Sequence, residues 1–87
     1  MTIHRHKDFD KQMDKIEKPL RQKVYERVQL LVMNESHPLL HNHKLGPPYD
    51  GYRSINITGN FRLVYKRIEP DIFYLRAVGT HHQLYGT

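Results

Sequence analysis

The sequence predicts an α+β fold in which two N-terminal helices pack on one face of an antiparallel sheet of three to four strands. Two observations lead to this prediction. Apolar residues recur at helical spacing in the first third of the chain, and they alternate with polar residues from position 52 onward. Helical and strand-like segments are therefore segregated along the chain, which is typical of the α+β class. The length of 87 residues indicates a single domain, 1–87.

Two apolar stripes predict the helices. The first consists of Phe9, Met13, Ile16 and Leu20, and the second of Leu20, Val24, Val28 and Leu31. Pro19 separates them, because proline is tolerated in the first turn of a helix but not in its middle. We expect one helix over 8–18, with Asp8 as its N-cap, and a second over 19–34. A short first strand over 2–7 is expected to join the same sheet.

A proline-rich connection over 35–51 leads into three strand-like runs. The runs cover 52–58, 61–66 and 72–78. Gly59-Asn60 between the first two is typical of a two-residue hairpin turn, and a second turn is expected over 69–71. The runs therefore predict an antiparallel meander.

Arg62 is the most informative residue of this meander. Alternation places Asn56 and Arg62 on the sheet face that the helices leave uncovered, whereas Leu63 and Tyr65 point toward the helices. A guanidinium on an open face is either an ordinary surface charge or a bidentate ligand for phosphate. The residue alone does not decide between these interpretations.

The composition favours a polyanionic partner. The chain carries 14 Lys and Arg against 9 Asp and Glu, a net charge of +5. Such a balance suits RNA, DNA or an acidic protein, although a solubilising surface explains it equally well. There is no cysteine, and the longest apolar run, 30–33, is too short to span a bilayer. We expect a cytoplasmic protein without a membrane partner.

Histidines provide candidate reactive groups. His81 and Tyr85 follow the last strand four residues apart, and both side chains transfer protons or stack on bases; a strand-end cap and a core tyrosine are the structural alternative. Three histidine pairs also suggest zinc: His4 and His6, His41 and His43, His81 and His82. With no cysteine and no suitably spaced carboxylate to complete a shell, no metal site is predicted.

Taken together, these features resemble the RelE/ParE toxin superfamily, and within it YafQ-type members. The likeness rests on the order of the elements and on the segments 37–45, 51–55, 61–66 and 79–81. The resemblance implies a small RelE-like fold and the toxin of a bacterial type II toxin–antitoxin pair. Such toxins enter the ribosomal A site and cut the mRNA there, and a cognate antitoxin neutralises them. No cofactor is implied.

The resemblance also assigns catalytic roles. Arg62 corresponds to the arginine that steadies the scissile phosphate, and His81 to an acid–base histidine of YafQ-like toxins. Tyr85 corresponds to a C-terminal aromatic residue that contacts RNA, and His43 to a histidine in the loop before the sheet. These groups suit metal-independent attack of a ribose 2′-OH on its own phosphate, which needs a base, an acid and a cation. Which histidine is the base stays open.

A second group of residues is expected to bind RNA: His41, Lys44, Arg53, Asn56, Asn60, Phe61 and Arg76. YafQ-like members carry a histidine and an aspartate where this chain has Asn56 and Asn60, and an arginine where it has Ala77. Arg76 lies beside that position and is expected to face the opposite way. Helix lysines are expected either to be solvated or to contact ribosomal RNA.

Two other functions remain open. The first is a ParE-like toxin that inhibits DNA gyrase, and the second is an inactive relative that only binds antitoxin or nucleic acid. Proton-transfer groups around a basic cleft favour the nuclease, because a gyrase inhibitor does not need them. The expected partners are therefore a cognate antitoxin and mRNA on the ribosome, without a small-molecule cofactor.

Overall fold

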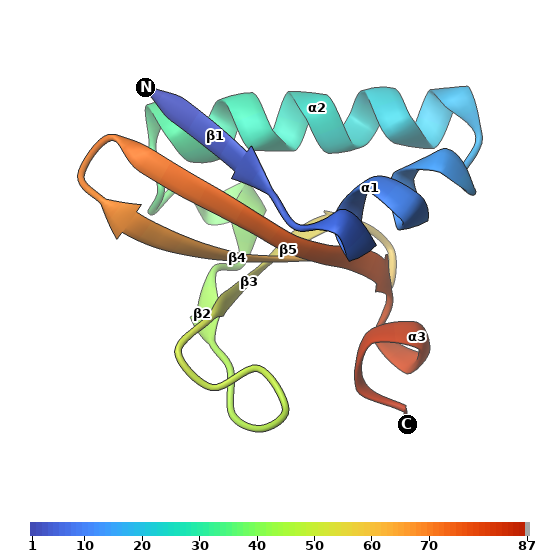
Figure 1. The fold of residues 1–87 in the computed structure, drawn as a ribbon. Helices are drawn as coiled ribbons and strands as arrows, with labels where there is room; N and C mark the ends of the chain where they lie inside the picture. Colours follow the sequence, from blue (N-terminus) through green and yellow to red (C-terminus); the bar gives the residue numbers. More distant parts are fainter. Residues whose placement is uncertain (87) are drawn as a thin grey trace.

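The computed structural model describes residues 1–86 and contains a five-stranded sheet in the order β1-β5-β4-β3-β2. In chain order the strands are β1 (Thr2–Arg5), β2 (His43–Lys44), β3 (Arg53–Thr58), β4 (Phe61–Glu69) and β5 (Ile72–Thr80). The helices are α1 (Lys7–Asp14), α2 (Lys18–Met33), the short 3-10 helix η1 (Pro38–Leu40) and α3 (His81–Tyr85). The predicted α+β class is confirmed (Figure 1).

The sheet is larger than predicted and is mixed. Strands β3, β4 and β5 form the expected antiparallel meander, but β1 pairs in parallel with β5. The two-residue β2 adds a fifth strand by pairing with β3. Parallel pairing requires a long connection between the strands, and here the two helices and the meander supply it. The predicted number of strands, three to four, was therefore too low, because β2 was not expected. The prediction that all strands are antiparallel was wrong for β1.

The N-terminal helices form the main core against one face of the sheet. Helix α2 lies along this face (Figure 1), and its Val24, Val28 and Leu31 are buried as the apolar stripe predicted. Phe9 and Met13 of α1 reach the same core. The strands contribute the buried residues Ile55, Ile57, Phe61, Leu63, Tyr65, Phe73, Leu75 and Val78. No helix within residues 1–86 has the length and apolar character needed to cross a bilayer.

The helix boundaries follow local chemistry. The N-cap of α1 is His6, not Asp8 as expected, because the His6 ring accepts a hydrogen bond from the Asp8 amide at 2.9 Å. Helix α2 begins at Lys18, so Pro19 lies in its first turn, where its missing N–H leaves no helical hydrogen bond unmade. The predicted separation into two helices is confirmed, but α1 ends at Asp14, before the expected end at 18.

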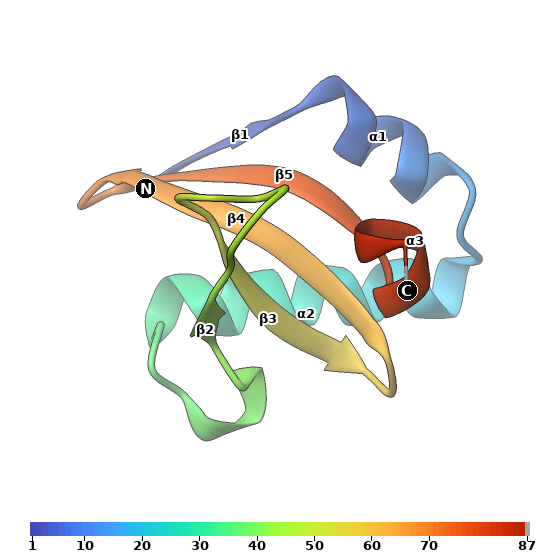
Figure 2. The same cartoon turned by 90° about the horizontal axis from the view of Figure 1, so that it is seen from below.

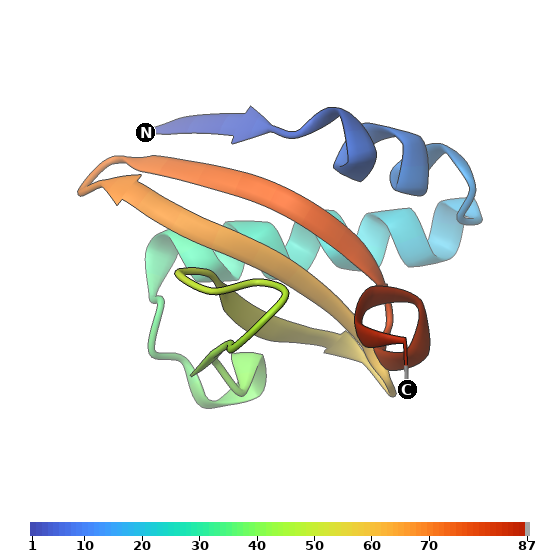
Figure 3. The same ribbon diagram turned by 60° about the horizontal axis from the view of Figure 1, so that its bottom comes forward.

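The second face of the sheet is not open, contrary to the expectation. The loop 45–52 and helix α3 lie over this face (Figures 2 and 3). Leu84 of α3 packs on Val64 and Ala77, and four loop and tail residues surround this second cluster: Leu45, Tyr49, Tyr52 and Tyr85. The amide of Leu45 donates to the carbonyl of Tyr52 at 3.1 Å, which closes the loop at its base. The proline-rich connection is therefore a structured cover that walls a cavity.

Candidate active site

The four predicted catalytic residues line one cavity on the face covered by α3. His43, Arg62, His81 and Tyr85 surround a space of about 480 Å³, and the loop residues Leu45, Gly46, Pro47 and Pro48 complete its wall. The four side chains come from β2, β4 and α3, which are far apart in the sequence. Volumes of this size are typical of sites for small ligands or single nucleotides. The fold thus brings together the groups that the sequence singled out.

Arg62 is the central cation of this cavity, and two hydrogen bonds hold it. Its Nε donates to the hydroxyl of Ser54 at 2.5 Å, and its Nη2 donates to the carbonyl of His41 at 3.0 Å. Within residues 1–86 its Nη1 makes no hydrogen bond. Burial lowers the pKa of Arg62, and the neighbouring Tyr85 opposes this shift, yet an arginine stays charged at neutral pH. The guanidinium is therefore fixed and cationic.

His43 lines the loop side of the cavity, and the backbone carbonyl of His41 lies beside it. His41 adopts the left-handed conformation with φ of 44°, which is uncommon for a residue other than glycine. Its carbonyl oxygen lies 3.1 Å from Nδ1 of His43 as well as accepting from Arg62. A carbonyl accepts only from a protonated ring nitrogen, so of the two neutral tautomers of His43 this contact favours the one with its lone pair on Nε2. Arg62 Nη2 lies 3.4 Å from the same Nδ1, but arginine only donates, so this longer contact is not a hydrogen bond when Nδ1 carries the proton that the nearer carbonyl accepts.

Helix α3 holds His81 and Tyr85 at the cavity, and this helix was not expected from the sequence. A capping box starts the helix: the Gln83 amide donates to the Thr80 hydroxyl at 3.1 Å, and the Thr80 amide donates to Gln83 Oε1 at 2.8 Å. The amide of His81 also donates to the carbonyl of Asn60 at 3.0 Å. The spacing Thr80-x-x-Gln83 is a sequence signal for a helix start that could have revealed α3.

The ring of Tyr85 is a wall of the cavity. Its centroid lies 4.6 Å from that of His81 and 5.9 Å from that of Tyr49. Its hydroxyl is shielded from solvent and has no hydrogen-bond partner in the described part of the chain. This arrangement favours a role for the aromatic ring over a role for the hydroxyl in proton transfer.

None of the predicted RNA-binding residues lines this cavity, and two of them, Phe61 and Arg76, have other contacts. Phe61 is only 9% exposed and belongs to the main core, so its ring is used in packing. Arg76 forms an ion pair with Asp8 at 3.2 Å, which ties β5 to α1. The register between β4 and β5 shifts at this point, so Arg76 does not face away from Ala77 as expected. Ala77 packs beside Tyr49, and the Arg76 guanidinium lies 5.9 Å from the Tyr49 ring.

Two asparagines lie in the β3–β4 hairpin, Asn56 within β3 and Asn60 in the turn. Asn56 lies directly opposite Arg62 in the ladder, so the two side chains share the cavity face. Asn60 lies in the hairpin turn, where only Gly59 has positive φ, and its carbonyl accepts the amide of His81. Asn56 is therefore a neighbour of the site, whereas Asn60 supports it through the backbone.

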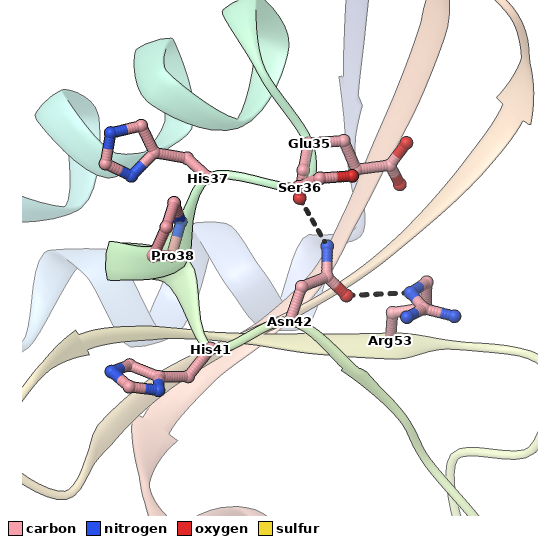
Figure 4. A pocket seen from close by; sticks show the side chains of 7 residues that line it. All are labelled: Glu35, Ser36, His37, Pro38, His41, Asn42 and Arg53. Carbon is pink, nitrogen blue, oxygen red and sulfur yellow. Dashed lines mark hydrogen bonds between the residues drawn. The ribbon is translucent and has the colours of Figure 1, made fainter.

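A second cavity of about 470 Å³ lies beside the first (Figure 4). It is lined by Glu35, Ser36, His37, Pro38, His41, Asn42 and Arg53. The Nε of Arg53 donates to the Asn42 side-chain oxygen at 2.7 Å, and the Asn42 amide donates to the Glu35 carbonyl at 3.1 Å. Arg53 also lies opposite Lys44 in the ladder, and both line a smaller hollow. Three of the predicted RNA-binding residues, His41, Lys44 and Arg53, thus lie next to the first cavity.

A polar network that the sequence did not reveal anchors this loop. The hydroxyl of the buried Tyr65 donates to Glu35 Oε2 at 2.5 Å and accepts from Asn42 Nδ2 at 2.6 Å. Burial, followed by the contact with Glu35, raises the pKa of Tyr65. Arg67 Nη1 completes the network by donating to Glu35 Oε1 at 2.9 Å. The network fixes Asn42, which lies between His41, whose carbonyl accepts from Arg62, and His43, which lines the candidate site.

The histidine pairs do not converge on a metal. Within residues 1–86 there is no group of three or more histidine, cysteine, aspartate or glutamate side chains that could hold a metal ion. His6 caps α1 instead, and His43 contacts the His41 carbonyl.

The fold and the cavity together define a RelE-like toxin domain. The chain belongs to the YafQ family, described as the bacterial toxin of a type II toxin–antitoxin system, whose family model matches residues 1–86. The resemblance noted from the sequence is thereby confirmed.

Solved structures with the same fold come from several bacteria. YafQ from E. coli is 22% identical, with 97% of each chain covered and a TM-score of 0.76. A YoeB/ParE toxin from Agrobacterium tumefaciens is 15% identical, with 93% of this chain and 99% of that one covered and a TM-score of 0.78. YafQ in the E. coli DinJ-YafQ complex is 24% identical, with 97% of each chain covered and a TM-score of 0.72. Among curated proteins, none matches this sequence.

Proposed function

We propose that the protein is a ribosome-dependent endoribonuclease that cuts mRNA in the A site and so inhibits translation. The observation that carries this proposal is the convergence of His43, Arg62 and His81 on one cavity. These side chains supply two proton-transfer groups and a fixed cation, which are the requirements for cleaving RNA through its own 2′-OH without a metal.

His43 acts as the base in this mechanism. Its Nε2 lone pair removes the proton of the 2′-OH, because its Nδ1 faces the His41 carbonyl. The 2′-oxygen then bonds to phosphorus, the bond from phosphorus to the 5′-oxygen breaks, and His81 protonates the leaving oxygen. The products are a 2′,3′-cyclic phosphate and a free 5′-hydroxyl. Each proton-transfer group contributes about 10²–10⁴ in rate.

Arg62 stabilises the transition state of this reaction. Its free Nη1 donates to the phosphorane oxygens, where negative charge increases as the 2′-oxygen attacks. The ring of Tyr85 contacts the nucleotide, as aromatic side chains do with splayed RNA bases. His41, Lys44 and Arg53 bind the neighbouring RNA backbone beside the cavity.

The surroundings of the site suit an RNA held by the ribosome. The net charge of +5 favours sequence-independent contacts with mRNA and ribosomal RNA in the cytoplasm. The cavity is open and lies on a small domain, so the ribosome has to present the mRNA in a splayed conformation. We therefore expect cleavage of translated mRNA and little cleavage of free RNA.

A cognate antitoxin is the second proposed partner. The E. coli relative is found in a complex with DinJ, which supports such a partner for a YafQ family member. A basic toxin surface is complementary to an acidic segment, and an antitoxin that covers the Arg62 side or the helices would block access to RNA.

A purified translation system tests the proposal. The protein is added to ribosomes that translate a reporter mRNA, and primer extension maps the 5′ ends. New ends inside A-site codons, absent when initiation is blocked, are expected. Gyrase supercoiling is assayed in parallel: inhibited supercoiling with intact mRNA would show a ParE-like inhibitor instead. If neither assay responds, the inactive relative is the correct interpretation.

A further inference from the structure

We propose that Ser54 is a positioning residue that sets the orientation of the Arg62 guanidinium. This inference rests on the proposed function, because it deepens the role of Arg62 in binding the scissile phosphate. Ser54 is on β3, the strand next to the one that carries Arg62, and no role was expected for it from the sequence.

The contact between the two residues is a consequence of the sheet register. Asn56 pairs with Arg62, and Ser54 pairs with Val64, so Ser54 is the diagonal neighbour of Arg62 on the same face. From this position its hydroxyl accepts the Nε–H of Arg62 at 2.5 Å. Both groups are held by strands, which fix positions better than loops do.

Burial makes this contact informative. Ser54 is fully buried, and it is the only polar or charged side chain other than tyrosine that is buried in the described part of the chain. Alanine would fill the same site without a hydroxyl to satisfy, so packing alone does not require serine. The oxygen is explained by its bond to Arg62, and water is excluded from its surroundings, which strengthens that bond.

A second anchor turns this bond into a clamp. The carbonyl of His41 accepts from Nη2 of Arg62, so the guanidinium is held on two nitrogens. Two bonds define the plane of a guanidinium, and its Nη1 is left without a hydrogen bond within residues 1–86. Because a guanidinium binds phosphate as a planar fork, its orientation decides whether it meets the phosphate oxygens. Without Ser54 only the carbonyl holds the group, and it is free to turn.

The test compares Ser54→Ala with Thr58→Val, which removes an exposed hydroxyl from the same strand. The first readout is the Nε–H resonance of Arg62 in the NMR spectrum, which does not depend on cleavage. The second is the cleavage rate on translating ribosomes, and the third is the affinity for a short single-stranded RNA. The cleavage rate and the RNA affinity are measured again in an Arg62→Ala background.

The expected result is specific to a positioning role. Ser54→Ala exposes the Arg62 Nε–H to rapid exchange and slows cleavage roughly 10- to 100-fold, the effect of losing a hydrogen bond to a charged group. Thr58→Val changes neither the exchange of this proton nor the cleavage rate. In the Arg62→Ala background Ser54→Ala has no further effect, because Ser54 acts through Arg62.

Other outcomes show which of the two proposals fails, the positioning role of Ser54 or the nuclease function. If the Arg62 Nε–H of the wild type is not protected from exchange, the proposed hydrogen bond to Ser54 is wrong, whatever the cleavage rate. The positioning role is overturned if Ser54→Ala removes the protection of the Arg62 Nε–H but leaves the cleavage rate and the RNA affinity unchanged. If the wild type does not cleave but Ser54→Ala weakens RNA binding only when Arg62 is present, the positioning role is supported and the nuclease proposal is the part that fails.

Discussion

Arg62 on β4 donates its Nε–H to the buried hydroxyl of Ser54 on β3 at 2.5 Å, on the sheet face that also carries the candidate catalytic histidines. The cation of the proposed site is therefore anchored within the sheet, while His43 comes from the two-residue edge strand β2 and His81 from the short helix α3. Charge and orientation at this position are separate requirements, and substitutions can distinguish between them.

Arg62→Lys tests the orientation requirement. Lysine keeps the positive charge but lacks both the Nε–H and the planar fork, so we expect cleavage to fall about 10²–10³-fold, as when one electrostatic stabiliser is removed. Single-turnover cleavage on stalled ribosomes is the measurement, with Arg5→Lys as a control because Arg5 forms an exposed ion pair away from the cavity. Wild-type rates for Arg62→Lys would show that charge alone is sufficient.

His81→Ala tests proton transfer. The loss of the proposed acid should reduce cleavage about 10²–10⁴-fold without unfolding the protein, because the His81 side chain is exposed. The neighbouring His82 is also exposed but does not line the cavity, so His82→Ala is the matched control. Equal rates for the two variants would remove His81 from the mechanism. Circular dichroism of both variants checks the fold.

Gly79→Ala tests the attachment of α3. A Cβ at position 79 would lie 2.9 Å from Gln83 Oε1 and 3.3 Å from Gln83 Cβ, so the capping box would have to shift. We expect a loss of about 1 kcal/mol of stability, the value of a helix cap, together with slower cleavage as His81 moves. Gly46→Ala is the stability control, because a Cβ there meets nothing within 4 Å. Thermal unfolding that is unchanged in Gly79→Ala would contradict the described contact.

Tyr65→Phe tests the loop network by its dependence on pH. The native state raises the pKa of Tyr65 above the ordinary value of 10.0, so the neutral phenol is favoured in the folded protein. Its contribution to stability is complete below about pH 10 and is lost as the pH rises through the folded pKa. Tyr65→Phe should lower stability by about 1–3 kcal/mol at neutral pH, because it removes the buried hydrogen bonds that the hydroxyl makes with Glu35 and Asn42.

The measurement for this variant is urea unfolding over a series of alkaline pH values. The wild type should lose stability faster than Tyr65→Phe as the pH rises. Tyr25→Phe is the control, since Tyr25 is 57% exposed. Parallel pH curves for the wild type and Tyr65→Phe would show that Tyr65 titrates normally.

The sequence predicted those elements whose patterns are long. The apolar stripes of α1 and α2, the Pro19 boundary and the three meander strands repeat over several turns or residue pairs, so local chemistry determines them. The parallel pairing of β1 with β5 could not be predicted, because the polar segment Thr2–Arg5 has no apolar alternation and its partner is distant in sequence. Helix α3 is too short for a periodic pattern, and only its capping box marks it.

The candidate site was predicted in part for a similar reason. His43, Arg62, His81 and Tyr85 are recognisable by residue type, and the fold does bring them together. Ser54 was missed because alternation assigned it to an open face, whereas the folded loop 45–52 covers that face. Arg76 was misplaced because a register shift between strands leaves no signal in the sequence.

Primer extension on a single mRNA in cells that express the protein tests the central claim most directly. The transcript is compared with a matched one whose start codon is removed, and the wild type with Arg62→Ala. The proposed function predicts cuts within codons of the translated transcript by the wild type, none in the untranslated transcript and few with Arg62→Ala. Intact mRNA with the wild type, or equal cutting of both transcripts, would contradict it.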